Sequence, residues 1–151
     1  MPRLLAGTLT IAAALWTAAI LFVPVRGRET PQLLTTSVYA AASLVCHQRA
    51  ERSFHVHGVK FPVCARCTGL YVSGAVGALI AWAGRARVPR RLRPILLAAA
   101  APTFLTLAIE WPGFANPGNV MRASAALPLG AFAGWLFVRL LRAEEQPIHA
   151  L

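Results

Sequence analysis

Four stretches of the chain contain almost only apolar residues and predict membrane-spanning helices. The first, residues 4–23, carries no charge, and a helix rising roughly 1.5 Å per residue would cross the hydrocarbon core over that length. Because this run is longer than the apolar region of a signal peptide and no small-residue cleavage site follows it, we expect an uncleaved anchor. The other predicted spans are residues 67–84, 95–110 and 123–141.

Residues 31–47 form a weaker apolar segment. Pro31 suits the first turn of a helix, and the residues after it are apolar on one side and rich in threonine and serine on the other. Because the segment is short and polar at its start, we expect an interfacial or partly inserted helix. The alternative is a fifth span.

Small residues recur along two of the predicted spans and favour close helix packing. Gly69, Ser73, Gly77 and Ala81 follow one another at intervals of four residues, which places them in one stripe along a helix. The last span carries a pair of glycines, Gly130 and Gly134. The sequence therefore predicts a single all-α integral membrane bundle over residues 1–151, with four transmembrane helices.

The composition agrees with a membrane protein. Hydrophobic residues make up 57% of the chain, charged residues only 13%, and the mean hydropathy is +0.58, which is too apolar for a soluble domain of this size. A net charge of +10 would suggest nucleic acid in a soluble protein. Here the arginines flank apolar segments, where they contact lipid headgroups, so the expected partner is the bilayer and not nucleic acid. A homo-oligomer or a larger membrane complex stays open.

The distribution of arginine predicts which way the chain is oriented. The loop from Arg85 to Arg93 contains five arginines and no acid, and short loops of this kind stay in the cytoplasm. The helix of residues 67–84 then begins on the other side. Residues 46–67 are therefore expected at the extracytoplasmic face of the cell membrane.

That extracytoplasmic segment carries all three cysteines of the chain. Cys46 and His47 are adjacent, and Cys64 and Cys67 form a CxxC pair at the start of a predicted helix. Three thiolates and one imidazole are the ligand set of a tetrahedral zinc site, and soft sulfur ligands favour zinc, copper(I) or iron. The sequence predicts a transition-metal site, most suitably for zinc, with a structural or a catalytic role.

Two further histidines are alternative ligands. Adjacent residues such as Cys46 and His47 rarely aim at one ion, so His55 or His57 would then supply the nitrogen. Their segment, SFHVHGVKF, predicts a short hairpin with a turn near Gly58.

A thiol redox function is the alternative to metal binding. A CxxC pair at a helix amino terminus has a lowered thiol pKa, and Arg66 adds a positive charge between the two cysteines. Such a pair would exchange disulfides and pass electrons to a lipid-soluble quinone, in an arrangement similar to that of quinone-linked disulfide-forming membrane enzymes. A second alternative is an accessory membrane subunit without chemistry of its own.

Other polar residues are expected on the same face of the membrane, as a shell around the metal or as an anion site. Glu110 and Arg122 end neighbouring spans, and we expect an ion pair between them. Tyr71 lies one helical turn beyond Cys67. The full set is Arg49, Arg52, Arg66, Tyr71, Glu110, Asn119 and Arg122.

The stretch CHQRAERSFHVHGVKFPVCARCTGLY resembles the signature of an uncharacterised prokaryotic membrane family, the domain of unknown function 2085. The similarity is close over residues 46–74. It extends more loosely to Glu110, Asn119, Arg122 and Gly130, which are similar to the family's acid, asparagine, arginine and glycine positions. His55 and His57 lie outside this pattern. The resemblance implies a membrane fold and a set of site positions, without an activity.

Overall fold

The computed structural model describes residues 2–84 and 88–143. Within them the elements in chain order are α1 (Pro2–Arg26), η1 (Gly27–Glu29), α2 (Gln32–Ser43), η2 (Ala50–Arg52), β1 (His55–Val56), β2 (Val59–Lys60), α3 (Ala65–Ala83), α4 (Leu92–Glu110) and α5 (Gly118–Ala143). The predicted all-α architecture is confirmed, with one two-stranded hairpin as its β structure in the described residues. The four predicted spans correspond to α1, α3, α4 and α5.

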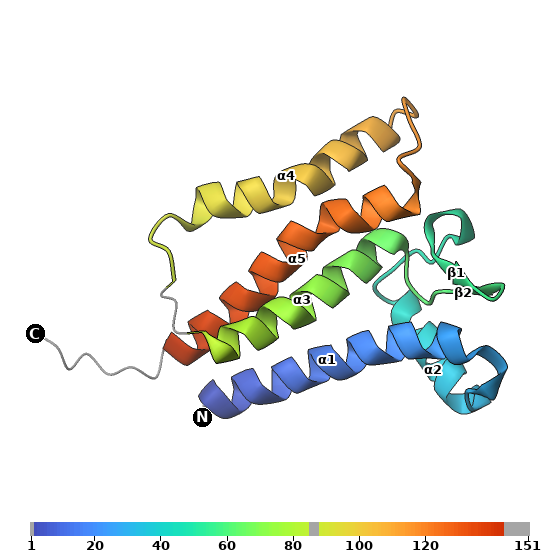
Figure 1. The fold of residues 1–151 in the computed structure, drawn as a ribbon, viewed down its shortest axis with the longest axis horizontal. Coiled ribbons are helices and arrows are strands. Elements are labelled where there is room, and N and C mark those ends of the chain that lie inside the picture. Colours follow the sequence, from blue (N-terminus) through green and yellow to red (C-terminus); the bar gives the residue numbers. More distant parts are fainter. Residues whose placement is uncertain (1, 85–87, 144–151) are drawn as a thin grey trace, which may run out of the picture.

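The four long helices lie side by side in the order α1, α3, α5, α4 (Figure 1). Side-chain hydrogen bonds to backbone carbonyls tie neighbouring helices together. Thr17 of α1 donates to the carbonyl of Tyr71 on α3 over 3.2 Å, and Thr103 of α4 donates to the carbonyl of Ala125 on α5 over 2.8 Å. These hydrogen bonds give each threonine hydroxyl group a partner inside an apolar bundle, where an unpaired polar group is costly in free energy.

Glycines set the distance between α3 and α5. A Cβ atom added at Gly77 would overlap the backbone of Ala131, and one added at Gly134 would overlap the backbone of Gly74. Gly69 lies equally close to Ala123. The predicted small-residue packing between these two helices is confirmed, because only residues without a side chain allow the backbones to approach so closely.

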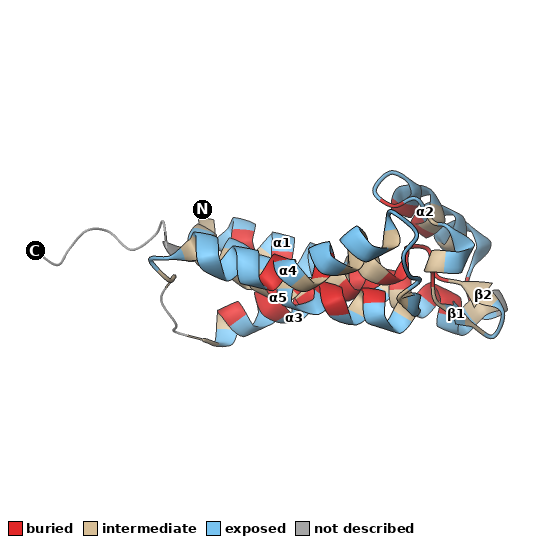
Figure 2. Cartoon of the chain, turned by 90° about the horizontal axis from the view of Figure 1, so that it is seen from above, coloured by how far each residue is buried: buried red, intermediate tan, exposed pale blue. Residues whose placement is uncertain are grey.

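Three helices of the described residues are long and apolar enough to cross a membrane, namely α1, α4 and α5 over Gly118–Arg142. Their large apolar side chains are mostly exposed, and exposed surface extends along the outside of the bundle (Figure 2). Lipid would cover such a surface. The central helix α3 is not among the three, since its arginine, hydroxyl-bearing and glycine residues lower its mean hydropathy.

The connection between α1 and α3 folds over one end of the bundle. Helix α2, at 12 residues, extends about 18 Å, which is too short to cross a bilayer. The predicted hairpin is confirmed, since β1 and β2 pair antiparallel and the turn contains His57 and Gly58, both with positive φ. The end of α1, the start of α3, the end of α4 and the start of α5 meet at this same end (Figure 1).

The opposite end of the bundle is rich in arginine. Arg139 and Arg142 of α5 donate to carbonyls at the end of α3, those of Gly84 and Ala81. Arg90 and Arg91 are exposed before α4. Of the basic loop discussed above, Arg85 and Arg87 lie outside the described residues.

Candidate functional site

The segment between α2 and α3 is held in place by its own polar side chains. Lys60 donates to the carbonyl of Gln48 over 2.7 Å, and the Gln48 amide donates to the carbonyl of Tyr39 over 2.8 Å. The Tyr39 hydroxyl donates in turn to the carbonyl of Lys60. This ring of hydrogen bonds joins the end of α2 to the hairpin and fixes the residues just after Cys46.

Gln48 has a φ of 50°, a left-handed conformation that is rare for a residue with a side chain. A conformation of this kind costs about 1 kcal/mol and persists only where the surroundings fix it, as the hydrogen bonds of Gln48 do. The chain therefore turns sharply directly after His47.

Cys46, His47 and Cys64 lie together. One ligand atom from each of the three residues lies within 4.8 Å of the other two. The Cys46 sulfur also accepts a hydrogen bond from the backbone N–H of Cys64 over 3.2 Å. Two parts of the chain that are 18 residues apart thus converge, as the sequence predicted.

Cys67, the fourth predicted ligand, lies in the first turn of α3 and is not among the three residues whose ligand atoms lie within 4.8 Å of one another. Its thiol and its backbone N–H both hydrogen bond to the Cys64 sulfur, and its thiol also contacts Cys46. Cys64 precedes the first residue of α3, so the CxxC spacing brings both sulfurs to the helix amino terminus. All three thiols are free in the structure.

The hydrogen bonds from Cys67 lower the pKa of the Cys64 thiol to about 5, against the opposing effect of burial. A hydrogen bond with Cys46 acts in the same direction, and so does His47 when its ring is protonated. Cys64 therefore has the character of a thiolate at neutral pH. A thiolate is the form of cysteine that binds metals and attacks disulfides.

His47 is the exposed member of the group, whereas Cys46 and Cys64 are buried. Its Nδ1 accepts a hydrogen bond from the backbone N–H of Arg49 over 3.1 Å, so the proton of the neutral ring is on Nε2. A metal bound at Nε2 requires the other tautomer and the loss of this hydrogen bond. The imidazole is thus the least firmly positioned of the four ligands.

A buried ionic network lies beside the sulfur atoms, at the ends of α3, α4 and α5. The carboxylate of Glu110 is 6% exposed and pairs with three guanidinium groups: Arg122 at 2.8 Å, Arg52 at 3.1 Å and Arg66 at 3.2 Å. The predicted pair of Glu110 and Arg122 is confirmed. The other two arginines come from η2 and from the CxxC turn, which ties the polar network to the sulfur cluster.

Amide and hydroxyl side chains complete this network. Arg122 donates to Asn119 and to Asn116, each over 2.9 Å, and Asn119 donates to the carbonyl of Ser53 over 2.9 Å. Arg66 donates to Thr106 over 3.2 Å. Sequence reasoning missed Asn116 and Thr106. Thr106 lies one turn before Glu110 on the same helix face, and that spacing was the available signal.

The remaining predicted residues are placed differently. His55 and His57 are exposed in the hairpin and do not belong to the group of three ligands. Tyr71 packs against the apolar residues around Cys46 and Cys64, with its ring edge to face against Trp16. The Arg49 side chain is exposed at the rim of a pocket that it shares with His47, Arg52 and Glu110.

Comparison with known proteins agrees with a membrane protein. The model of a family described as a predicted membrane protein (DUF2085) matches residues 46–136. An uncharacterised protein of Methanothermobacter thermautotrophicus is 34% identical over 86 residues, which are 57% of this chain and 78% of that protein. An uncharacterised protein of Methanocaldococcus jannaschii is 45% identical over 49 residues, which are 32% of this chain and 31% of that protein. No solved structure matches the chain at a comparable level of significance.

Proposed function

This chain belongs to the DUF2085 family of predicted membrane proteins, and we propose that it is a multi-pass membrane protein that binds one transition-metal ion, preferably zinc. The ligands are Cys46, His47, Cys64 and Cys67. The observation that carries this proposal is the grouping of ligand atoms from Cys46, His47 and Cys64 within 4.8 Å of one another.

The donor set and its surroundings support this proposal. Sulfur atoms bound to one tetrahedral zinc ion lie about 4 Å apart, so the ligand atoms of Cys46, His47 and Cys64 need only small shifts around an ion at this position. Cys67 is not in that group and would have to move closer to become the fourth ligand. The lowered pKa of Cys64 supplies a thiolate without a large cost in free energy. Three sulfur donors with one nitrogen favour zinc over magnesium or calcium, which prefer oxygen ligands.

The same proposal includes an arrangement in the membrane. Helix α3 crosses the bilayer as a fourth span between α1 and α5, and α2 lies in the interface. The end of the bundle that holds Cys46, His47, Cys64 and Cys67, here called the metal end, faces the extracytoplasmic side. The reason is that the arginine-rich loop before α4 stays in the cytoplasm. His47 is exposed and would leave the ion accessible from the water, which suits a catalytic as well as a structural metal.

Elemental analysis of the detergent-purified protein tests the metal site. We expect close to one zinc ion per chain, and loss of that ion in Cys64→Ala. The His47→Ala variant retains a larger share of the metal than the cysteine variants, because its imidazole is the most loosely held ligand. His57→Ala is the matched control and retains the full content. A purified protein without transition metal would overturn the proposal.

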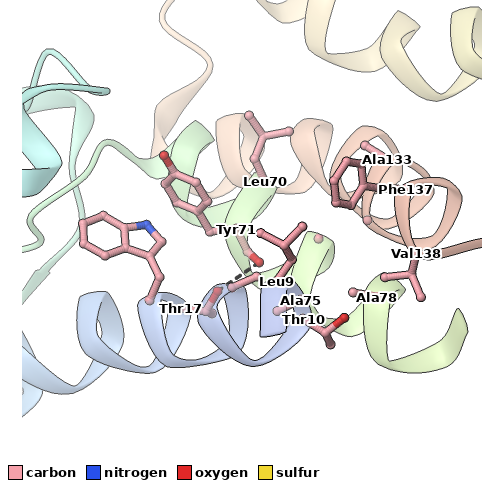
Figure 3. Close-up of a pocket in the computed structure, with 14 residues that line it drawn as sticks. Leu9, Thr10, Thr17, Leu70, Tyr71, Ala75, Ala78, Ala133, Phe137 and Val138 are labelled. Carbon is pink, nitrogen blue, oxygen red and sulfur yellow. Dashed lines mark hydrogen bonds between the residues drawn. The ribbon is translucent and has the colours of Figure 1, made fainter. Parts of the chain in front are cut away.

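Thiol chemistry with a quinone is the second candidate, and two observations favour it: the lowered pKa of Cys64 and an apolar cavity of about 450 Å³. This cavity lies between α1, α3 and α5, and its lining residues include Leu9, Leu70, Tyr71 and Phe137 (Figure 3). Tyr71 also contacts the residues around the sulfur cluster, so the cavity reaches toward the thiols.

In this reaction the thiols of Cys64 and Cys67 form one S–S bond and release two electrons and two protons. The quinone takes up both and becomes a quinol. Mass spectrometry of the alkylated protein separates the two candidates. A reversible disulfide between Cys64 and Cys67 in metal-free protein supports the redox function, whereas free thiols with one bound zinc support the metal site.

A further inference from the structure

Positive charge exceeds negative charge in the buried network at the metal end of the bundle. Three guanidinium groups, from Arg52, Arg66 and Arg122, pair with the single carboxylate of Glu110. The other carboxylate of this region, Glu51, is exposed and forms no ion pair with these arginines in the described residues. Two positive charges are therefore left without a counterion. The side chains of Arg66 and Arg122 are buried, whereas that of Arg52 is 31% exposed and partly hydrated. An anion beside Arg52 would offset the surplus charge of the network.

The hydrogen-bonding capacity of these arginines is also incompletely used. The Nε atoms of Arg66 and Arg122 are buried and have no partner. Arg122 is 4% exposed as a whole residue. Buried donors normally find an acceptor, so these two atoms mark a network with more donors than acceptors. Neither arginine lines the pocket described next, so the two Nε atoms are not counted among its contacts.

A pocket opens directly on this network. It encloses about 440 Å³ and is lined by His47, Arg49, Arg52, Leu107, Glu110 and Trp111. The guanidinium of Arg49 has no partner in the described part of the chain and lies at the rim. Arg49 and Arg52 are three residues apart, so two forked donors border the same space. Leu107 and Trp111 add an apolar wall on the α4 side.

We propose that this pocket binds the phosphate group of a phosphomonoester, held by Arg49 and Arg52. A phosphomonoester carries nearly two negative charges at neutral pH. With Arg49 included, four guanidinium groups lie near the single carboxylate of Glu110, so a phosphomonoester offsets more of the positive charge than a carboxylate does. Guanidinium groups bind phosphate oxygens through paired hydrogen bonds. The pocket is larger than a phosphate group and leaves room for the alcohol part of the ester beside Leu107 and Trp111.

The pocket adjoins the metal site proposed above, because His47 belongs to both. A phosphate held there lies next to a ligand of the ion, and the arginines and the metal would act on the same bound molecule. Only this last step rests on the proposed function. The surplus charge and the pocket are independent of any metal.

Two sources supply such a group: a soluble phosphomonoester, or a lipid with a phosphomonoester headgroup. Equilibrium dialysis of inorganic phosphate against the detergent-purified full chain probes the first. To probe the second, the same chain is reconstituted into phosphatidylcholine vesicles with and without phosphatidic acid, and the binding of phosphatidic acid to the chain is measured. Saturable binding in either experiment supports the proposal and identifies the source. Its absence in both overturns the proposal.

Substitutions localise the site. Arg49→Gln and Arg52→Gln should each weaken binding at least about tenfold, as expected for the loss of a charged hydrogen-bond donor. Arg90→Gln is the matched control, because Arg90 is an exposed arginine at the opposite end of the bundle. Arg49→Gln is the cleaner variant, since its side chain has no partner whose loss would disturb folding. Equal binding by Arg49→Gln, Arg52→Gln and Arg90→Gln would contradict the assignment.

The same experiments separate this proposal from the metal site. Cys64→Ala should lose zinc and retain phosphate binding, because no cysteine lines the pocket. A protein that binds phosphate and never binds zinc overturns the metal proposal alone. A protein that binds zinc and no phosphomonoester overturns the pocket alone.

Discussion

The thiol of Cys64 differs from the other two in its surroundings, since it receives hydrogen bonds from both the side chain and the backbone of Cys67. Hydrogen bonds to the charged form of an acid lower its pKa. In metal-free protein we therefore expect one thiol to lose its proton near pH 5 and to stay a thiolate above it, where an ordinary thiol titrates at about 8.5. Thiolate absorbance in the ultraviolet measures this step.

The variants of the CxxC pair provide the control for that titration. Cys64→Ala should remove the low step, and Cys67→Ala should move it upward toward the ordinary value, because the donor is gone. A wild-type protein whose thiols all titrate like free cysteine would show that Cys67 does not stabilise the charged form of Cys64.

Glu110 is the residue on which the buried network depends. Glu110→Gln keeps the shape of the side chain and removes its charge, which leaves three guanidinium groups together without a carboxylate. Breaking a buried ion pair by removal of one partner costs about 3 kcal/mol or more. Unfolding of the variant in detergent should show a destabilisation of this size.

Glu51→Gln is the matched control, because Glu51 is exposed and substitution of such a residue typically changes stability by at most about 0.5 kcal/mol. If Glu110→Gln proves as stable as Glu51→Gln, the network contributes nothing to the stability of the fold. The arginines would then be held apart by their other partners, such as Thr106 and Asn119.

At the scale of the helices, the contact between α3 and α5 depends on residues without side chains. Gly77→Ala places a methyl group against the backbone of Ala131, and a backbone cannot give way as a flexible side chain can. We expect destabilisation by about 2 kcal/mol or more, measured by unfolding in detergent.

Gly74→Ala is the control on the same helix. The nearest atom to a Cβ at Gly74 is the carbonyl oxygen of Gly130, at 3.6 Å, which is an ordinary contact. Both substitutions remove a glycine from a helix, so both gain helix propensity equally. A similar loss of stability in the two variants would contradict the close backbone approach at Gly77.

The helices and their packing face were predictable because their signals are local. A run of apolar residues needs no information about its neighbours, and small residues at intervals of four lie on one side of any helix. The hairpin was predictable for the same reason, since Gly58 and the alternation around it predict a turn. The signature over residues 46–74 was specific enough to identify the family, which the family model confirms.

The site was predictable only in part, because it depends on contacts between distant segments. The sequence indicated that Cys46 and Cys64 would meet, and it indicated the pair of Glu110 and Arg122. It gave no reason to expect Arg52 and Arg66 on the same carboxylate, since this depends on the path of the chain between α2 and α3. The left-handed turn at Gln48, directly after His47, has no signature in the sequence.

For the whole molecule, the two ends of the bundle differ in chemistry. One end holds the sulfur atoms, the ionic network and the pocket, while the other holds arginines on α5 and before α4. Both ends carry arginine, but at the end with the sulfur atoms three arginines share the carboxylate of Glu110. We therefore expect the arginines of the opposite end to orient the protein. If α3 crosses the bilayer, the hairpin lies on one side and Arg90 on the other.

Labelling of single cysteines tests this orientation. In a chain whose three native cysteines are replaced by serine, His57→Cys places a thiol in the exposed hairpin turn and Arg90→Cys places one before α4. A membrane-impermeant maleimide added to intact cells should label His57→Cys and leave Arg90→Cys unlabelled until the membrane is permeabilised. Labelling of Arg90→Cys alone would reverse the orientation. Labelling of both in intact cells would show that α3 does not cross the bilayer, because the two ends of that helix would then face the same compartment.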